Sequence, residues 1–94
     1  MSGGATVYLL RCVDGSLYCG MTKRSVEERV YEHNCATFKG YTSSRLPVTL
    51  LWSEHFINLT DAITAERRIK GWSRAKKRAL AAGDWLLLQD LSIA

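Results

Sequence analysis

An Asp-Gly pair between two strand-like runs is the feature that most restricts how this chain can fold. Residues 5–12 and 16–22 are short runs rich in apolar residues and tyrosine, and Asp14-Gly15 lies between them. Glycine adopts positive φ without steric cost, so this pair between two such runs is a strong signal for a β-hairpin. The chain is therefore expected to begin with two antiparallel strands.

The length of the hairpin loop decides where Tyr8 and Tyr18 point. A two-residue loop, 14–15, places the two rings on opposite faces of the sheet, because side chains alternate along a strand. A three-residue connection, 13–15, moves both rings to one face. We predict the three-residue connection.

Signals of helix and strand ends divide the rest of the chain. Ser25 with Glu28 forms a capping box that opens a helix running to residue 34 or 35. A polar loop follows at 39–46, and Pro47 precedes a third strand at 48–53.

Two further helices and a short terminal one are expected after the third strand. Thr60 caps a second helix that breaks near 71–72, and Ser73 caps a third helix that Gly83 closes. Residues 84–91 form a short terminal helix that packs Trp85 and leucines onto the core. The prediction is one α/β (α+β) domain over 1–94, with its core at about 5–82: a small three-stranded, mostly antiparallel sheet flanked by helices in the order ββαβαα.

Simple exclusions follow from the composition. The apolar runs are far below the roughly 20 residues that cross a bilayer, and no secretory signal precedes them, so a cytoplasmic protein without a membrane partner is expected. Three cysteines cannot all pair within one chain and none forms a CxxC pair, which favours free thiols with no disulfide partner and no structural zinc.

The positive charge is concentrated in one segment. Residues 64–78 hold seven of the 13 basic side chains and a single acid, Glu66. Such a segment suits a polyphosphate partner, because each neutralised phosphate releases counterions. An ordinary solvated helix face explains the pattern about equally well.

Polar side chains interrupt two apolar helix faces. Arg29 and His33 share the sheet-facing side of the first helix with valines, while Glu32 points elsewhere. Glu66 lies centrally on the apolar side of the second helix, where it needs an arginine partner, a cation or a solvent-filled cleft. Each feature alone has a structural explanation: strand tyrosines are usually core, and Arg29 with Glu66 could form a buried ion pair. Their joint occurrence favours a functional site.

The ordered series of these residues resembles the GIY-YIG nuclease superfamily. It begins with Val7-Tyr8-Leu9 and Tyr18-Cys19-Gly20, and it continues through residues 28–34, 41–48, 65–66 and 69–70. The series is similar to the short stand-alone bacterial branch, the YhbQ-like proteins, over nearly the whole chain.

The resemblance implies a metal-dependent endonuclease that hydrolyses DNA phosphodiester bonds in repair or end processing. Glu66 would hold one Mg²⁺ or Mn²⁺ ion, Arg29 would stabilise charge on the phosphate, and Tyr8 would act as general base. Tyr18 would orient the water or the phosphate, and His33 would relay the proton. Single-stranded or duplex DNA would be held along its backbone by two groups of residues, Lys39, Tyr41, Thr42 and Arg45 in the loop and Lys70, Arg74, Lys76 and Lys77 in the basic segment.

Two other functions stay open at this stage. Several nuclease members carry an asparagine about a dozen residues after the metal-binding glutamate, and none follows Glu66 here. This difference favours a nucleic-acid-binding module with little or no cleavage activity. A protein-interaction domain whose basic face meets an acidic partner is the third alternative.

Overall fold

A computed structural model describes residues 4–35, 42 and 44–93. Three strands and four helices follow one another along the chain in the order ββαβααα. The elements are β1 (Ala5–Arg11), β2 (Leu17–Thr22), α1 (Val26–Asn34), β3 (Thr49–Phe56), α2 (Leu59–Lys70), α3 (Arg74–Ala82) and α4 (Trp85–Ile93). The predicted class is confirmed, and α4 is the expected short terminal helix. No helix in the described part of the chain is long and apolar enough to span a membrane.

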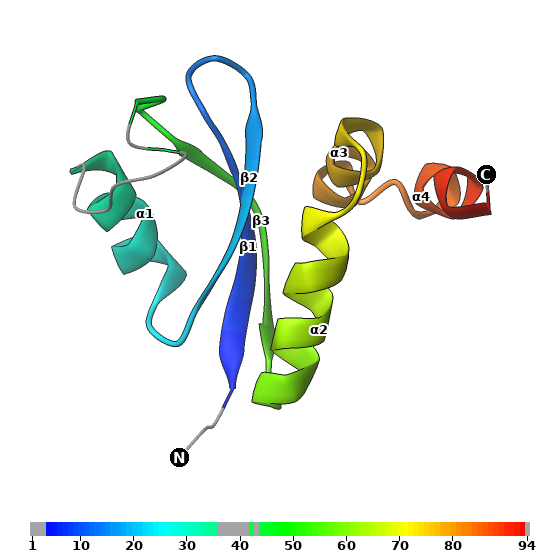
Figure 1. The fold of residues 1–94 in the computed structure, drawn as a ribbon, viewed down its shortest axis with the longest axis horizontal. Helices are drawn as coiled ribbons and strands as arrows, with labels where there is room; N and C mark the ends of the chain where they lie inside the picture. Colours follow the sequence, from blue (N-terminus) through cyan, green and yellow to red (C-terminus); the bar gives the residue numbers. More distant parts are fainter. Residues whose placement is uncertain (1–3, 36–41, 43, 94) are drawn as a thin grey trace.

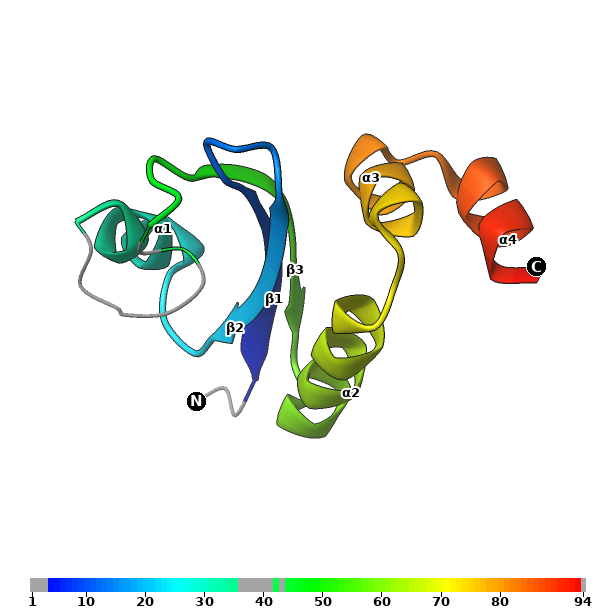
Figure 2. The ribbon, with the colours of Figure 1, turned by 45° about the horizontal axis from the view of Figure 1, so that its top comes forward.

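The sheet has the strand order β2-β1-β3, and both neighbours of β1 are antiparallel to it. Helix α1 covers one face of this sheet, whereas α2 and α3 lie on the other face (Figure 1). The view in Figure 2 shows the same three layers, and the strand order places β2 at one edge of the sheet and β3 at the other. Strand β2 therefore borders both helical layers.

The hairpin between β1 and β2 has the predicted three-residue loop. Cys12 N–H donates to the carbonyl of Ser16 at 2.8 Å, and Gly15 N–H donates back to the carbonyl of Cys12 at 2.9 Å. Gly15 has φ of 84°, which a glycine adopts without strain. In the resulting register Tyr8 pairs with Gly20 and Leu10 pairs with Tyr18, so both tyrosines lie on the same face of the sheet.

Each face of the sheet buries its own apolar cluster. On the α2 side the cluster contains Val7, Leu9, Cys19 and Ile69, with Leu80 from α3. On the α1 side it contains Tyr8, Leu10 and Cys12, against which Val26 and Val30 of α1 pack. Because residues alternate along β1, one central strand supplies both clusters.

Most predicted helix ends are confirmed, and one is wrong. The Ser25 hydroxyl accepts the N–H of Glu28, the Ser73 hydroxyl accepts the N–H of Lys76, and Gly83 closes α3 with φ of 69°. Thr60 does not cap α2: the helix begins one residue before it, and Asn58 is the N-cap residue. The leucine before Thr60 packs onto the core, and this packing extends the helix beyond the capping signal.

The terminal helix packs less closely than the sequence pattern suggests. Trp85 is 58% exposed and Leu86 is 78% exposed, and Leu88 is the α4 residue that packs against the core cluster. Figure 1 shows α3 lying between α4 and the sheet. The prediction that Trp85 packs onto the core is therefore wrong, because α3 already occupies the position next to β3.

Because the core is buried and α4 is largely exposed, a Leu→Ala substitution should lower the free energy of unfolding by different amounts at the two places. Leu9 is fully buried, so Leu9→Ala should lower the free energy of unfolding by about 2–5 kcal/mol. Leu86 is mostly exposed, so Leu86→Ala should change it by less than about 0.5 kcal/mol. Urea denaturation of both variants measures the difference. Equal losses would contradict the placement of α4.

Candidate functional site

The hydroxyl of Tyr8 is the centre of a polar group inside the α1-side cluster. The side chain is 1% exposed, and its oxygen lies 3.2 Å from Nε2 of His33. Arg29 donates its Nε–H to the same oxygen at 3.3 Å. On the far side of the imidazole, Nδ1 of His33 lies 2.8 Å from the hydroxyl of Thr42. Two residues of α1, one strand tyrosine and Thr42 are thus joined by hydrogen bonds.

The donor roles in this group define one consistent arrangement. Arg29 can only donate, so the Tyr8 oxygen accepts from it and its own O–H remains for Nε2 of His33. His33 is then neutral, with its proton on Nδ1 and directed at Thr42. In this arrangement His33 has an accepting nitrogen next to the phenol.

The pKa values agree with that assignment. Burial lowers the pKa of His33 below 6.5, and the nearby charge of Arg29 lowers it further. Burial also raises the pKa of Tyr8 above 10, although the hydrogen bond and charge of Arg29 act in the opposite direction. At neutral pH, Tyr8 is therefore a phenol and His33 is an uncharged base.

Gly20 gives the Tyr8 ring its space. A Cβ atom at position 20 would lie 2.5 Å from the Tyr8 oxygen and 2.6 Å from its Cζ atom. Tyr18 also borders this space, since its Cε2 atom would lie 3.0 Å from such a Cβ. Only glycine allows the Tyr8 ring of β1 to approach the β2 backbone this closely.

The second tyrosine joins the group through the imidazole. The rings of Tyr18 and His33 pack edge to face, with centroids 5.7 Å apart, and the rings of Tyr8 and His33 pack similarly at 6.2 Å. Tyr18 is only half-buried. Four of the five predicted catalytic residues, Tyr8, Tyr18, Arg29 and His33, are therefore brought together on one face.

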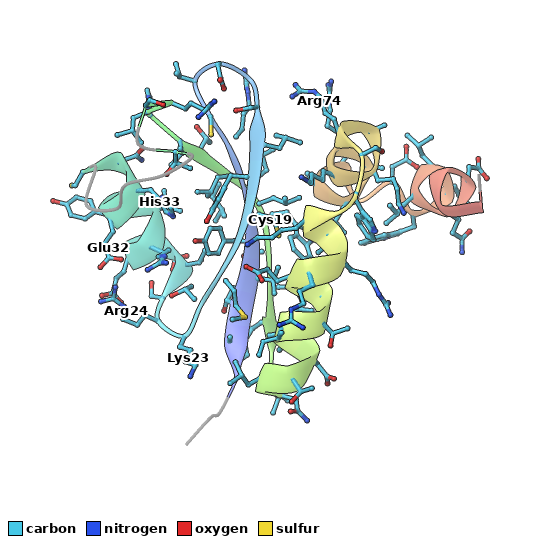
Figure 3. The ribbon with its side chains drawn as sticks, viewed as in Figure 1. Cys19, Lys23, Arg24, Glu32, His33 and Arg74 are labelled. Carbon is cyan, nitrogen blue, oxygen red and sulfur yellow. The ribbon has the colours of Figure 1, made fainter. Side chains whose placement is uncertain are left out.

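Two residues to which the sequence assigned no site role hold this face in place. Glu32 was expected to point elsewhere, but Arg24 donates to one of its oxygens at 2.5 Å and Arg29 lies 3.8 Å from the other. Figure 3 shows Arg24 and Glu32 side by side, with His33 on the side of α1 that faces the sheet. Asn34 accepts the backbone N–H of Val48 at 2.7 Å and donates to its carbonyl at 3.2 Å, which ties the end of α1 to the start of β3. Capping and turn signals in the sequence predict neither the ion pairs of Glu32 nor the hydrogen bonds between Asn34 and Val48.

Glu66 approaches from the other side of the sheet. Its carboxylate lies 3.1 Å from Nζ of Lys70, and its side chain is 18% exposed. The hydrogen bond to Glu66 raises the pKa of Lys70, and the neighbouring Tyr18 and Cys19 raise it further. The Cys19 thiol donates to the backbone carbonyl of Glu66 at 3.9 Å, so the pair lies beside the edge strand β2. The sequence left an arginine, a cation or a solvent-filled cleft open as the partner of Glu66, and in the structure its partner is a lysine.

Cys19 of β2 lies beside the Glu66–Lys70 pair. Its side chain faces α2, and burial together with the charge of Glu66 raises the pKa of the thiol to about 11. The positive charges of Lys70 and Lys77 act in the opposite direction and lower that pKa. All three cysteines are free thiols, as predicted.

The predicted nucleic-acid contacts are divided between several surfaces. Lys39 and Tyr41 lie outside the described residues. Thr42 is buried against His33, and Arg45 pairs with Asp14 at 3.1 Å, where it joins the polar loop to the hairpin. The other predicted contacts lie on α2 and α3: the ammonium of Lys76 lies over the Trp72 ring at 4.6 Å, and Lys70, Arg74 and Lys77 share this side of the molecule.

A divalent ion at Glu66 would have one protein carboxylate. Among the described residues, no three His, Cys, Asp or Glu side chains gather into a ligand group. Mg²⁺ commonly takes one or two carboxylates and completes its shell with waters and substrate phosphates. Glu66 fits an open site of that kind when it exchanges Lys70 for the ion.

Fold and site together define a small α+β domain with two strand tyrosines, an arginine and a histidine gathered on one face of its sheet. The family model of the GIY-YIG catalytic domain matches residues 4–79. The chain therefore belongs to the GIY-YIG family.

Relatives in archaea and bacteria have the same short format. The UPF0213 protein of Halobacterium salinarum is 46% identical over 74 residues, which cover 79% of this chain and 95% of that protein. Two solution NMR structures share the fold. The protein from E. faecalis has 32% identity and a TM-score of 0.60, with 92% of this chain and 93% of the other covered. The UPF0213 protein from Bacillus halodurans has 34% identity and a TM-score of 0.55, with 84% and 83% covered.

The space at Gly20 can be tested by a single methyl group. Gly20→Ala should displace Tyr8, lower the free energy of unfolding by about 1–3 kcal/mol and shift the NMR signals of the His33 ring. Gly71→Ala is the matched control, because its Cβ would meet its nearest neighbour at 3.6 Å, an ordinary contact. A Gly20→Ala variant as stable as Gly71→Ala, with unchanged His33 signals, would show that the close approach does not matter.

Proposed function

We propose that this protein is a divalent-metal-dependent nuclease that hydrolyses DNA phosphodiester bonds, with DNA repair or end processing in the cytoplasm as its setting. The observation that carries the proposal is the hydrogen-bonded series Arg29, Tyr8, His33 and Thr42. A buried phenol between a guanidinium and a neutral imidazole costs stability relative to an apolar residue of similar shape. A role in proton transfer beside a negatively charged substrate would explain why this costly polar group is present.

Arg29 and Tyr18 would meet the phosphate first. The Arg29 side chain is 28% exposed, its Nε donates to Tyr8 and its Nη1 lies 3.8 Å from Glu32. A guanidinium presents a fixed fork of donors to the non-bridging oxygens and stabilises the charge that grows on them during attack. Tyr18 borders the same space and would orient the phosphate or the attacking water.

Tyr8 and His33 would move the proton of that water. The attacking water enters between Arg29 and Tyr18 and gives a proton to the Tyr8 oxygen, while Tyr8 passes its own proton to Nε2 of His33. The water oxygen forms the new bond to phosphorus, and the 3′ oxygen leaves with its electron pair and takes a proton from solvent. Because the phenol receives one proton as it loses another, no free phenolate forms, which suits the raised pKa of Tyr8.

Glu66 would hold the divalent ion at the β2 edge, with Lys70 as its partner in the absence of the ion. A bound Mg²⁺ or Mn²⁺ would add positive charge beside the phosphate oxygens. The Glu66–Lys70 pair also favours the second candidate, a nucleic-acid-binding module, because a carboxylate already neutralised by lysine can be structural.

Cleavage of labelled single-stranded and duplex DNA separates the two candidates. We expect cleavage in Mg²⁺ or Mn²⁺ that EDTA abolishes, and a loss of roughly 100-fold or more in Glu66→Gln and in Tyr8→Phe. Glu54→Gln, which removes an exposed carboxylate from β3, should cleave like the wild type. DNA binding without metal-dependent cleavage would support the binding module, and cleavage that survives Glu66→Gln would overturn the assigned metal ligand.

The pH profile tests the role of His33 separately. His33 must be neutral to accept the proton, and its pKa is lowered below 6.5, so the rate should fall only as the pH drops through that lowered value. Above pH 6.5 the profile should be flat until another group titrates. His33→Gln should lower the rate roughly 10²- to 10⁴-fold and remove the acidic limb. An acidic limb centred above 6.5, or one that persists in His33→Gln, would assign it to a different group.

A further inference from the structure

A cleft lined by arginines lies on the face of the sheet opposite Tyr8. An open cleft of about 490 Å³ lies between the hairpin end, β3 and α3. Three arginines line it: Arg11 from the end of β1, and Arg74 and Arg78 from α3. Its other lining residues are small or apolar, namely Gly15, Leu17, Leu51, Ala81 and Ala82.

The charge in this cleft is uncompensated within the described part of the chain. None of the lining residues is acidic, and all the ion pairs found there involve other cations. Arg74 is held in place, since its Nη1 donates to the carbonyl of Gly15 at 2.6 Å. Figure 3 shows Arg74 beside the hairpin end. Three guanidiniums around one space repel one another until an anion enters.

We propose that this cleft binds a phosphate group, and that in the nuclease the group belongs to the nucleic-acid backbone. That the phosphate comes from DNA rests on the proposed function. That the cleft binds an anion is argued from the cleft alone. Guanidiniums from different elements can each present paired donors to the oxygens of a single phosphate. Arg11 belongs to this site although it lies far in sequence from the basic segment.

The cleft lies where a bound nucleic-acid backbone could continue to the candidate catalytic residues. Lys70 pairs with Glu66, whose carbonyl accepts from the Cys19 thiol of β2 at 3.9 Å, and Arg74 and Arg78 continue the positive charge along α3. Leu17 of β2 lines the cleft, while Tyr18, the next residue, packs against His33. A strand of DNA held in the cleft would therefore follow β2 to the site.

Fluorescence anisotropy of a labelled oligonucleotide measures the contribution of the cleft. Arg11→Gln and Arg78→Gln should each weaken binding roughly 3- to 10-fold at any DNA sequence, and each should reduce the salt slope by about one. Arg74 is left unchanged, because it also supports the hairpin. Lys23→Gln is the control: it removes one exposed charge near the start of α1, at the opposite end of β2 from Arg74 in Figure 3, and should change binding less than about twofold.

NMR titration with inorganic phosphate and with a 5′-mononucleotide tests the anion site without DNA. Backbone amide signals of Gly15, Leu17 and Ala81 should shift in the wild type and stay unchanged in the Arg11→Gln, Arg78→Gln double variant. If these small anions compete with DNA, the cleft takes a terminal or free phosphate. If only DNA shifts the signals, it takes a backbone diester.

The outcomes separate failure of the cleft from failure of the proposed function. A wild type that does not bind DNA but shows the phosphate-dependent shifts refutes the nuclease proposal and keeps the anion site. A double variant that binds DNA as tightly as the wild type, together with absent phosphate shifts, overturns the cleft. Circular dichroism of each variant confirms that the fold is retained, and an unfolded Arg11 variant leaves Arg78→Gln as the deciding measurement.

Discussion

The shared hydrogen bonds of the Tyr8 hydroxyl are the interaction on which the candidate site depends. The phenol is buried in an apolar cluster, where an unpaired hydroxyl is costly, so Arg29 and His33 must both face the sheet. That requirement fixes the rotation of α1 about its axis. It is met only because Gly20 leaves space for the ring and because the hairpin loop places Tyr18 on the same face.

Local chemistry made most of the fold predictable from sequence. The loop at 13–15 followed from the need to bring two tyrosines together, and the ends of α1 and α3 followed from Ser25, Ser73 and Gly83. Helical periodicity also placed Arg29 and His33 correctly on the sheet side. These signals act within a few residues or along one regular element, where the geometry is known in advance.

Contacts between elements were not predictable in the same way. Thr42 was assigned to a nucleic-acid surface, but its hydroxyl lies at Nδ1 of His33, and periodicity around α1 did not reveal that Glu32 joins Arg24 and Arg29. The exposure of Trp85 depends on α3 already lying next to β3. In each case the partner is chosen by tertiary packing, which overrides the local preference of a side chain.

The edge position of β2 is what would let groups on opposite faces of the sheet contact one substrate. Alternate residues of this strand face alternate layers: Tyr18 and Gly20 face α1, while Leu17 and Cys19 face α2 and α3. In a central strand, the residues facing the two layers would be separated by the backbones of the neighbouring strands. At the edge, the proposed nucleic-acid backbone would pass around β2 from the arginine cleft to Arg29 without crossing the sheet. Glu66 and Lys70 lie beside this same edge, where the Cys19 thiol donates to the Glu66 carbonyl, so the strand order β2-β1-β3 would let residues of both helical layers contact one substrate.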